Sequence, residues 1–394
     1  MASDQQSGRY LFIDLFRGAA IVFMLQGHTF RTLLQPAVHQ HPLYILQDLF
    51  HGLTAPIFLV GAGLTFVIAT RKRWEEYHKL SRPLARRLGR ILLVLGLGIA
   101  LHLPYFSLRK IISEGTAAEY LSMFQCDVLH CIGVGLFMLH GLIFFFRSQR
   151  QFYGLVLAAA AAIPLLTPLM WDVDFLQYYP AGIAQLFNSK YGSPFPLFPF
   201  LGFLLVGVIV SWEFIRATER ERQILFIRRL WIVGPVLFLV GLALDSVPFQ
   251  LYPTYNFWYT SPSYFAMRAG VVLVVVAAFW YLARFAERAP RWKGIVQKCC
   301  SGLALLGRES LLVYVVHMAI LYGSVVNPFI SLRVFFGATV NVWEATAVMI
   351  LFLAAMLGLA FVWDFLKLRR PVVHRVIQFV AAAAFLSVFI LNPY

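Results

Sequence analysis

The chain has 394 residues, of which 60% are hydrophobic and only 13% are charged, and its mean hydropathy is +0.74. This composition excludes an ordinary soluble domain and predicts a helical membrane protein with several spans. The formal net charge of +15 would suit a nucleic-acid binder. However, the basic residues gather in alternate connections between apolar runs, where they act as topology signals, and we expect no nucleic-acid partner.

Apolar runs of roughly 20 residues predict an all-α polytopic membrane protein with about 11 transmembrane helices. The expected spans are 10–34, 49–70, 88–107, 127–147, 151–171, 196–216, 229–248, 263–284, 300–325, 342–366 and 373–392. We treat residues 1–394 as a single domain in the lipid bilayer, with a core over 10–366 and an extra C-terminal helix over 373–392.

The distribution of basic residues predicts the orientation of these spans. Of the 33 Lys and Arg residues, 25 lie at one set of alternating segment ends, 5 at the other set and 3 within spans. Cytoplasmic connections carry the excess of positive charge. We therefore expect a multi-pass protein of the plasma (inner) membrane, with a cytoplasmic N-terminus and an external C-terminus. No cleavable signal peptide is expected, because charged residues interrupt the first apolar run.

Three ionisable residues share one stripe of the first expected span. Asp14 and Arg17 are three residues apart and Arg17 and His28 are eleven apart, which is about three helical turns. An ionisable residue near the bilayer centre costs about 2.5–3.5 kcal/mol on insertion scales. We expect the stripe to face a wet cavity and to mark a functional site. A buried Asp14–Arg17 salt bridge that only fixes helix packing is the alternative.

These side chains suggest chemical roles. Arg17 suits a phosphate or carboxylate, because its planar guanidinium donates several hydrogen bonds and stays charged. His28 can take a proton from a hydroxyl or amine near neutral pH, or it can simply be hydrogen-bonded at the interface. His51 is a second candidate base or a substrate-orienting group, unless it only caps its helix. His39 and His41 lie in an external loop, where we expect them to be solvated, and they stay alternatives.

Further polar residues recur in later runs at similar depth. In 307–317, Ser310 and His317 share a helix face, whereas Arg308 points the other way if the helix is straight. A common polar cavity would satisfy all these groups jointly. The other polar residues of this kind are His102, Asp127, His130, Arg268 and Tyr314.

Several site classes lack their motifs. The four cysteines, Cys126, Cys131, Cys299 and Cys300, have no metal-ligand spacing, and we expect no bound metal. The glycine clusters lie in apolar spans without GxGxxG context, and no GxSxG run suggests a serine hydrolase.

The run IDLFRG, His28 eleven residues after Arg17, and the run APIFLVGAG resemble the start of the transmembrane acyltransferase superfamily. The later runs DVLHCIGVG, SPFPLFPFLGFLLVG and GRESLLVYVVH are similar, in the same order, to the bacterial branch of the heparan-α-glucosaminide N-acetyltransferase family. This resemblance implies ten or eleven spans around a polar tunnel. It also implies that acyl-CoA enters from the cytoplasmic side and a sugar acceptor from outside.

The resemblance assigns His28 to the signature's proposed catalytic histidine and Arg17 to its arginine. The heparan-type enzymes use a later histidine, for which His39, His41 and His51 are the nearest matches here. The identity of the base is therefore left open between His28 and this later group.

We therefore expect an acyltransferase that moves an acetyl group from cytoplasmic acetyl-CoA to an external or membrane-associated sugar or glycan, through N- or O-acetylation. The expected catalytic residues are His28, His51 and Asp14. The expected residues that bind the acyl-CoA donor are Arg17, Arg308, Ser310 and His317. A proton-coupled transporter that uses the same Asp/Arg/His stripe is the main alternative, and a non-catalytic scaffold is another. The acceptor, the acyl-chain length and a homo-oligomeric state are left open.

Overall fold

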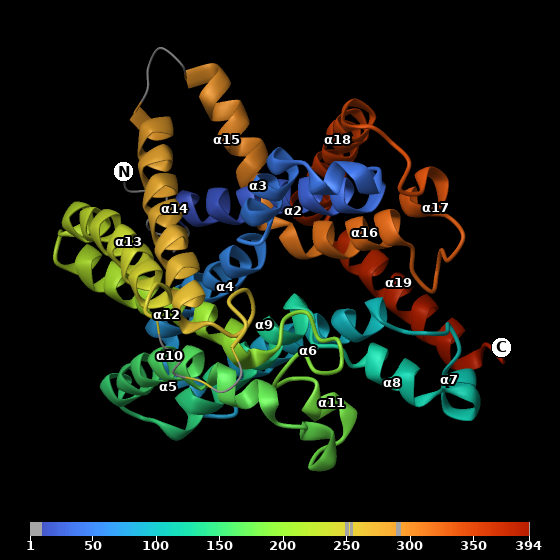
Figure 1. Cartoon of the computed structure of the whole chain (residues 1–394), viewed down its shortest axis with the longest axis horizontal. Coiled ribbons are helices and arrows are strands. Elements are labelled where there is room, and N and C mark those ends of the chain that lie inside the picture. The colour runs from blue at the N-terminus through green and yellow to red at the C-terminus, as the bar shows by residue number, and fades with distance from the viewer. Residues whose placement is uncertain (1–9, 249–251, 253–254, 289–292, 394) are drawn as a thin grey trace. The chain divides into compact units, whose positions relative to one another are not determined.

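The computed structural model describes residues 10–248, 252, 255–288 and 293–393, and its regular structure is almost entirely helical (Figure 1). In this part of the chain, extended backbone pairs only at an isolated bridge between Leu34 and Val340. The longer helices are α2 (Leu11–Leu33), α4 (Thr54–Thr70), α6 (Arg82–Leu101), α9 (Val128–Phe145), α10 (Gln149–Asp172), α12 (Leu197–Glu219), α13 (Gln223–Asp245), α14 (Pro262–Arg288), α15 (Lys293–Arg308), α16 (Ser310–Tyr322), α18 (Val342–Arg369) and α19 (Pro371–Leu391). The shorter helices are α3 (Pro42–His51), α5 (Trp74–Tyr77), α7 (Leu108–Glu114), α8 (Ala117–Met123), α11 (Ala181–Ala184) and α17 (Leu332–Phe336).

The helices confirm the expected class, an all-α polytopic membrane protein. Among the described residues, nine helices are long and apolar enough to cross a membrane, or ten if α15 and α16 form one bent span. Helix α6 is not among them, because Arg86, Arg87 and Arg90 crowd its first half. It nevertheless covers the third expected span, which was placed at 88–107, and it starts earlier and ends at Leu101.

The ninth expected span, 300–325, is broken into two helices. Helices α15 and α16 are bent by 78° relative to each other, and Figure 1 shows them running in different directions. The break lies at Glu309, whose backbone leaves the helical region at φ −99° and ψ 25°. The straight helix assumed from the sequence is therefore wrong here, and the facing of Arg308 relative to His317 cannot be taken from helical periodicity.

The chain forms two compact units. Of the described residues, the first contains those within 10–16, 55–98 and 124–288, and the second contains those within 17–54, 99–123 and 293–393. Whether they act as the single domain expected from the sequence stays a prediction.

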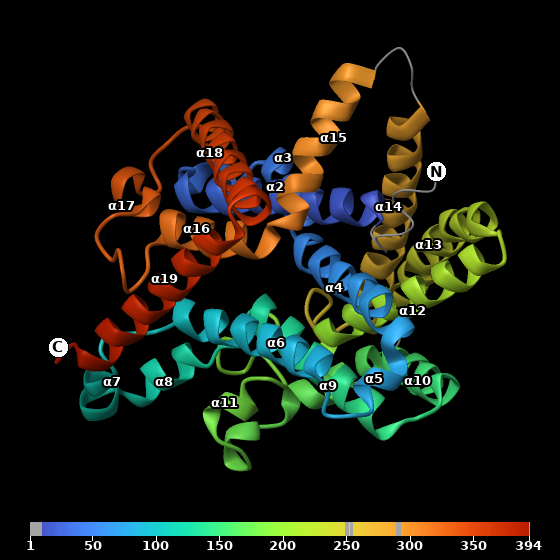
Figure 2. The ribbon, with the colours of Figure 1, turned by 180° about the vertical axis from the view of Figure 1, so that it is seen from behind.

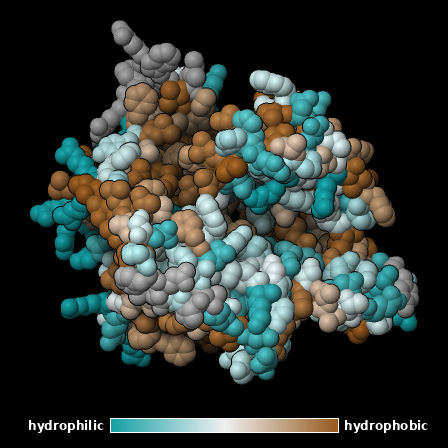
Figure 3. All heavy atoms as spheres, viewed as in Figure 1, coloured by the Kyte–Doolittle hydropathy of each residue, from teal (hydrophilic) through white to brown (hydrophobic). Residues whose placement is uncertain are grey.

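In the first unit, helix α13 lies along α14, and α10 lies along α12 (Figure 2). Glycines allow the close contacts. A Cβ on Gly270 would lie 2.3 Å from the carbonyl oxygen of Gly234, and one on Gly63 would lie 2.1 Å from the carbonyl oxygen of Leu204. Small residues at such crossings are typical of helices packed within membranes. The outer surfaces of α13 and α14 carry apolar side chains, as Figure 3 shows, which suits contact with lipid.

In the second unit, helix α2 crosses α15 at Gly18, where a Cβ would lie 1.9 Å from the carbonyl oxygen of Leu303. Only 6% of the most apolar stretch of helix α19 is buried. The C-terminal end of this helix is nevertheless held by hydrogen bonds. The Ser107 hydroxyl donates to the Asn392 carbonyl oxygen at 2.6 Å, and the Asn392 amide donates to the Phe106 carbonyl oxygen at 2.9 Å. The residues of α2, α3 and α16 in this unit carry most of the candidate site.

Candidate active site

Three histidines that lie far apart in the sequence meet in the second unit. His28 Nδ1 lies 3.1 Å from His317 Nε2, and the two rings are stacked with centroids 5.3 Å apart. The His51 ring meets the His28 ring edge-on at 5.2 Å. His317 is fully buried. The structure therefore brings together both predicted bases and one residue that was predicted to bind the donor.

The hydrogen bonds of His317 determine which nitrogens carry protons when both rings are neutral. His317 Nδ1 lies 3.1 Å from the carbonyl oxygen of Val313, which can only accept, so this nitrogen carries the proton. His317 Nε2 is then an acceptor, and His28 Nδ1 must donate to it. His28 Nε2 consequently carries the lone pair. The Val313 carbonyl thus orients His317, and His317 orients His28 so that His28 Nε2 can accept a proton.

Gly27 makes room for the His51 ring. A Cβ at position 27 would lie 1.9 Å from His51 Nδ1, so no other residue fits without moving the ring. The His51 imidazole has a backbone hydrogen bond with Phe23, whereas its Nδ1 atom is buried and meets no partner at hydrogen-bond geometry among the described residues. Such an atom is costly unless a ligand or a water satisfies it. His51 can therefore accept or donate one further hydrogen bond.

Helix α3, which carries His51, is held against α2 by polar contacts. The Gln47 amide donates to Gln26 Oε1 at 3.0 Å, and Arg31 Nη2 donates to Asp48 Oδ1 at 2.6 Å. These contacts position His51 one helical turn after Asp48.

Two predicted donor-binding residues, Arg17 and Ser310, also meet in the second unit. Arg17 Nη2 donates to Ser310 Oγ at 2.6 Å, and Ser310 is 5% exposed. Ser310 is the first residue of α16, directly after the break at Glu309. A serine hydroxyl and a guanidinium at this distance offer donors to an anionic or carbonyl oxygen.

A partly open cleft of about 460 Å³ lies beside the histidines. Its lining residues are Arg31, Thr32, Tyr322, Arg333, Gly337 and Ala338. The Tyr322 ring is 5.8 Å from the His28 ring, so this side chain belongs both to the cleft wall and to the histidine cluster. Our sequence reasoning missed Tyr322 and Arg333. The usable signal was an arginine in a connection on the side where basic residues are rare.

Comparison with known protein families identifies the family of this chain. The family model for the heparan-alpha-glucosaminide N-acetyltransferase catalytic domain matches residues 9–244, which is more than half of the chain. The chain belongs to this family. A comparison with curated protein sequences found no significant match. The family assignment confirms the resemblance seen in the sequence, whereas the bacterial branch stays a prediction.

The match makes the chain a member of a membrane acetyltransferase family, and the transporter alternative is not favoured. It includes His28 and His51 but ends well before Ser310 and His317. The family match therefore says nothing about Ser310 and His317 of this acetyltransferase-family protein, and their assignment to the site depends on the contacts described above.

Asp14 is the third predicted catalytic residue. It is 7% exposed and lies on α2 fourteen residues before His28. At 1.5 Å per residue, fourteen residues correspond to a rise of about 21 Å along a helix. A catalytic role of Asp14 stays a prediction.

Arg308 is paired with a residue that we did not predict. Arg308 Nη2 lies 3.3 Å from Asp364 Oδ2 on α18, and Lys367 Nζ lies 2.8 Å from Glu309 Oε1. The two ion pairs hold both sides of the helix break. Asp364 and Lys367 were visible in the sequence as charges at the end of an apolar run, but nothing in the pattern named their partners. Arg308 can bind a donor phosphate only while it shares or leaves Asp364.

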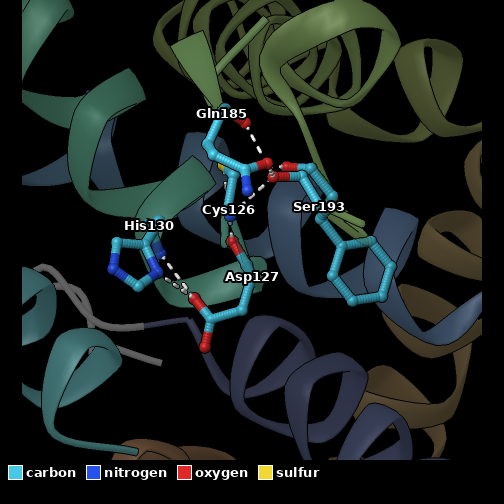
Figure 4. A network of polar contacts seen from close by, with 6 residues as sticks. Cys126, Asp127, His130, Gln185 and Ser193 are labelled. Carbon is cyan, nitrogen blue, oxygen red and sulfur yellow. Dashed lines mark hydrogen bonds and ion pairs between the residues drawn. The ribbon is translucent and has the colours of Figure 1, made fainter. Parts of the chain in front are cut away.

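Asp127 and His130 form a separate network in the first unit (Figure 4). Asp127 Oδ1 caps α9 by accepting from the His130 backbone at 2.9 Å and from His130 Nδ1 at 2.7 Å. The neighbouring Cys126 backbone donates to Ser193 Oγ at 2.9 Å, and Ser193 Oγ donates to Gln185 Oε1 at 2.5 Å. Burial raises the pKa of the Cys126 thiol well above its usual range. The network ties the 185–193 loop to the start of α9.

His39 and His41, the other candidate bases, have local structural contacts. The His39 ring stacks on Tyr44 with centroids 4.5 Å apart, and His41 Nδ1 accepts from the Leu43 backbone at 3.3 Å at the start of α3. Of the later histidines, only His51 has a described contact with His28.

Proposed function

We propose that this protein transfers an acetyl group from acetyl-CoA to a sugar hydroxyl or amine, with His28 as the general base. The observation that carries the proposal is the pair of hydrogen bonds from Val313 through His317 to His28. It supports a neutral His28 whose Nε2 can accept a proton. General base catalysis by a positioned side chain typically contributes about 10²–10⁴-fold to the rate.

The reaction needs one proton to be held and returned. His28 Nε2 takes the proton of the acceptor hydroxyl or amine while the acceptor oxygen or nitrogen attacks the thioester carbonyl. The carbon–sulfur bond breaks, and the CoA thiolate takes the proton back from the imidazolium. The products are the acetylated acceptor and free CoA. His317 stabilises the imidazolium by accepting from its Nδ1, and we assign it as a positioning residue.

Arg17 and Ser310 are our candidates for the donor side. Their side chains meet at 2.6 Å on the face of α2 that also carries His28, three turns away. The guanidinium suits the phosphates or the thioester oxygen of acetyl-CoA. Arg308 adds a second guanidinium, which Asp364 partly neutralises.

His51 supports a second route through the same cluster. Its ring contacts His28, and its Nδ1 has no partner among the described residues. In that route His51 accepts the acetyl group to form an acyl-histidine, and His28 then activates the acceptor. We propose the direct route first, because His28 is the histidine whose orientation is set by a second histidine.

Acetyl transfer by the full chain in detergent tests the proposal. Radiolabelled acetyl-CoA is supplied with amino sugars and neutral sugars, and acetylated product is measured for the wild type and for His28→Ala. We expect loss of at least about 100-fold in kcat for the variant. Full activity in His28→Ala would overturn the assignment. Solute counterflow in proteoliposomes without CoA would instead support the transporter.

A further inference from the structure

The cleft beside the histidines is lined by two guanidinium groups. Arg31 lies in the last turn of α2 and Arg333 lies on α17, and both line the same 460 Å³ space. Tyr322 lines this space, and its ring lies 5.8 Å from the His28 imidazole. A ligand in the cleft therefore sits one aromatic side chain away from the proposed base.

The charges around the cleft are not balanced. Arg31 pairs with Asp48 at 2.6 Å, and this pair is well exposed, with 55% and 37% of the two side chains accessible. Arg333 is exposed and forms no ion pair with any described residue. One carboxylate therefore faces two guanidinium groups. By our assignment these are two of only five basic residues on the external side, so topology signalling does not account for them.

We propose that Arg31 and Arg333 form a subsite for an anionic group of the acceptor, a phosphate ester or a carboxylate. The volume of the cleft lies in the range of small-molecule sites, and paired guanidinium groups bind such anions through several charge-assisted hydrogen bonds. This inference rests on the proposed function, because the acceptor must reach His28.

Asp48 already forms an ion pair with one of the two arginines of this subsite. Its carboxylate already holds Arg31, and an incoming anion competes with it for the same guanidinium. Asp48 lies three residues before His51 on α3, and the neighbouring Gln47 holds the same helix to Gln26 of α2. Occupation of the subsite therefore changes one of the contacts that position His51.

Equilibrium binding without acetyl-CoA tests the subsite separately from catalysis. The full chain in detergent is titrated calorimetrically with glucosamine 6-phosphate, glucosamine and inorganic phosphate. In the wild type we expect the sugar phosphate to bind about tenfold tighter than either of the other two, as about 1.4 kcal/mol of charge-assisted bonding requires. Equal binding of glucosamine and its phosphate would overturn the subsite. Equal binding of inorganic phosphate and the sugar phosphate would overturn its assignment to the acceptor.

Substitutions at Arg333 and at Asp48 should change phosphate binding in opposite directions. Arg333→Gln should remove the preference for the phosphate, whereas Arg333→Lys should keep part of it. Asp48→Asn should strengthen phosphate binding, because it frees Arg31 from its competitor. Arg375→Gln, on the exposed helix α19, removes the same charge outside the cleft and should bind as the wild type does. An unchanged preference in Arg333→Gln, or weaker binding in Asp48→Asn, would contradict the proposal. If acetyl transfer fails while this pattern holds, only the proposed reaction is wrong.

Discussion

His28 and His317 lie 289 residues apart in the sequence, and their ring nitrogens are 3.1 Å apart in the folded chain. His317 accepts through Nε2 because its other nitrogen donates to a backbone carbonyl. His317→Gln should therefore lower kcat for acetyl transfer by roughly 10–1,000-fold, since His28 loses the partner that orients its ring, while the KM for acetyl-CoA changes little. Steady-state kinetics at several pH values measure both effects.

The matched control for His317 is His39→Ala, which removes a histidine whose ring stacks on Tyr44. We expect this variant to keep wild-type kcat. Loss of activity in His39→Ala with normal activity in His317→Gln would move the base to the loop after α2.

Gly27 admits the His51 ring, and Gly27→Ala should displace it. The new methyl group would overlap His51 Nδ1, so α3 must shift or the ring must rotate. We expect a destabilisation of about 1–3 kcal/mol, as for other overpacked sites, together with a large loss of kcat. The unfolding of the protein in detergent with added denaturant measures the first effect.

The control for Gly27 lies in α9. A Cβ on Gly141 would meet no heavy atom within 4 Å, so Gly141→Ala should be neutral or stabilising by up to about 1 kcal/mol. Equal stability of the two alanine variants would show that the His51 ring is not constrained by Gly27.

Substitutions in the Arg308–Asp364 pair can separate its contribution to stability from a contribution to donor binding. The side chains are 28% and 19% exposed, so Asp364→Asn should cost about 1–2 kcal/mol of stability rather than the full value of a buried pair. If Arg308 also binds the donor, Arg308→Gln should raise the KM for acetyl-CoA, whereas Asp364→Asn should not.

The double variant of this pair completes the cycle. Arg308→Gln with Asp364→Asn should recover part of the lost stability, because neither charge is then left unpaired. If the KM for acetyl-CoA is unchanged in Arg308→Gln, Arg308 has only a structural role at the helix break.

The cysteines should differ sharply in their reactivity. Cys299 is exposed, whereas Cys126 is fully buried and burial raises the pKa of its thiol. We expect a maleimide to label Cys299 in the folded protein and Cys126 only after denaturation, even at pH 8.5, where a free thiol is about half ionised. Mass spectrometry of labelled peptides measures this.

The same cysteine tests the orientation. A membrane-impermeant maleimide should label Cys299 in inside-out vesicles and leave it unlabelled in right-side-out vesicles, because we place the start of α15 in the cytoplasm. The opposite pattern would invert the proposed topology.

The class of the protein, the approximate positions of most of its spans and the polar stripe on the first span could be predicted from the sequence alone. Apolar runs of bilayer length, separated by charged connections, leave few alternatives to a helical membrane protein, because unsatisfied backbone groups are excluded from lipid. The spacing of Arg17 and His28 placed both on one face of α2. The motif order was also sufficient to suggest the family that the comparison confirmed.

Which polar residues contact one another could be learned only from the packing of the helices. Helical periodicity is a local property, and it took Ser310 and Arg308 as parts of one straight helix. The residues at the bend, Arg308 and Glu309, form ion pairs with Asp364 and Lys367 of α18, and no local sequence pattern contains these pairs. The contact of His28 with His317, the space that Gly27 leaves for His51, and the placement of Arg31 and Arg333 on one cleft likewise arise from helix packing. Such contacts join distant parts of the chain, and their energies come from geometry that one helix does not encode.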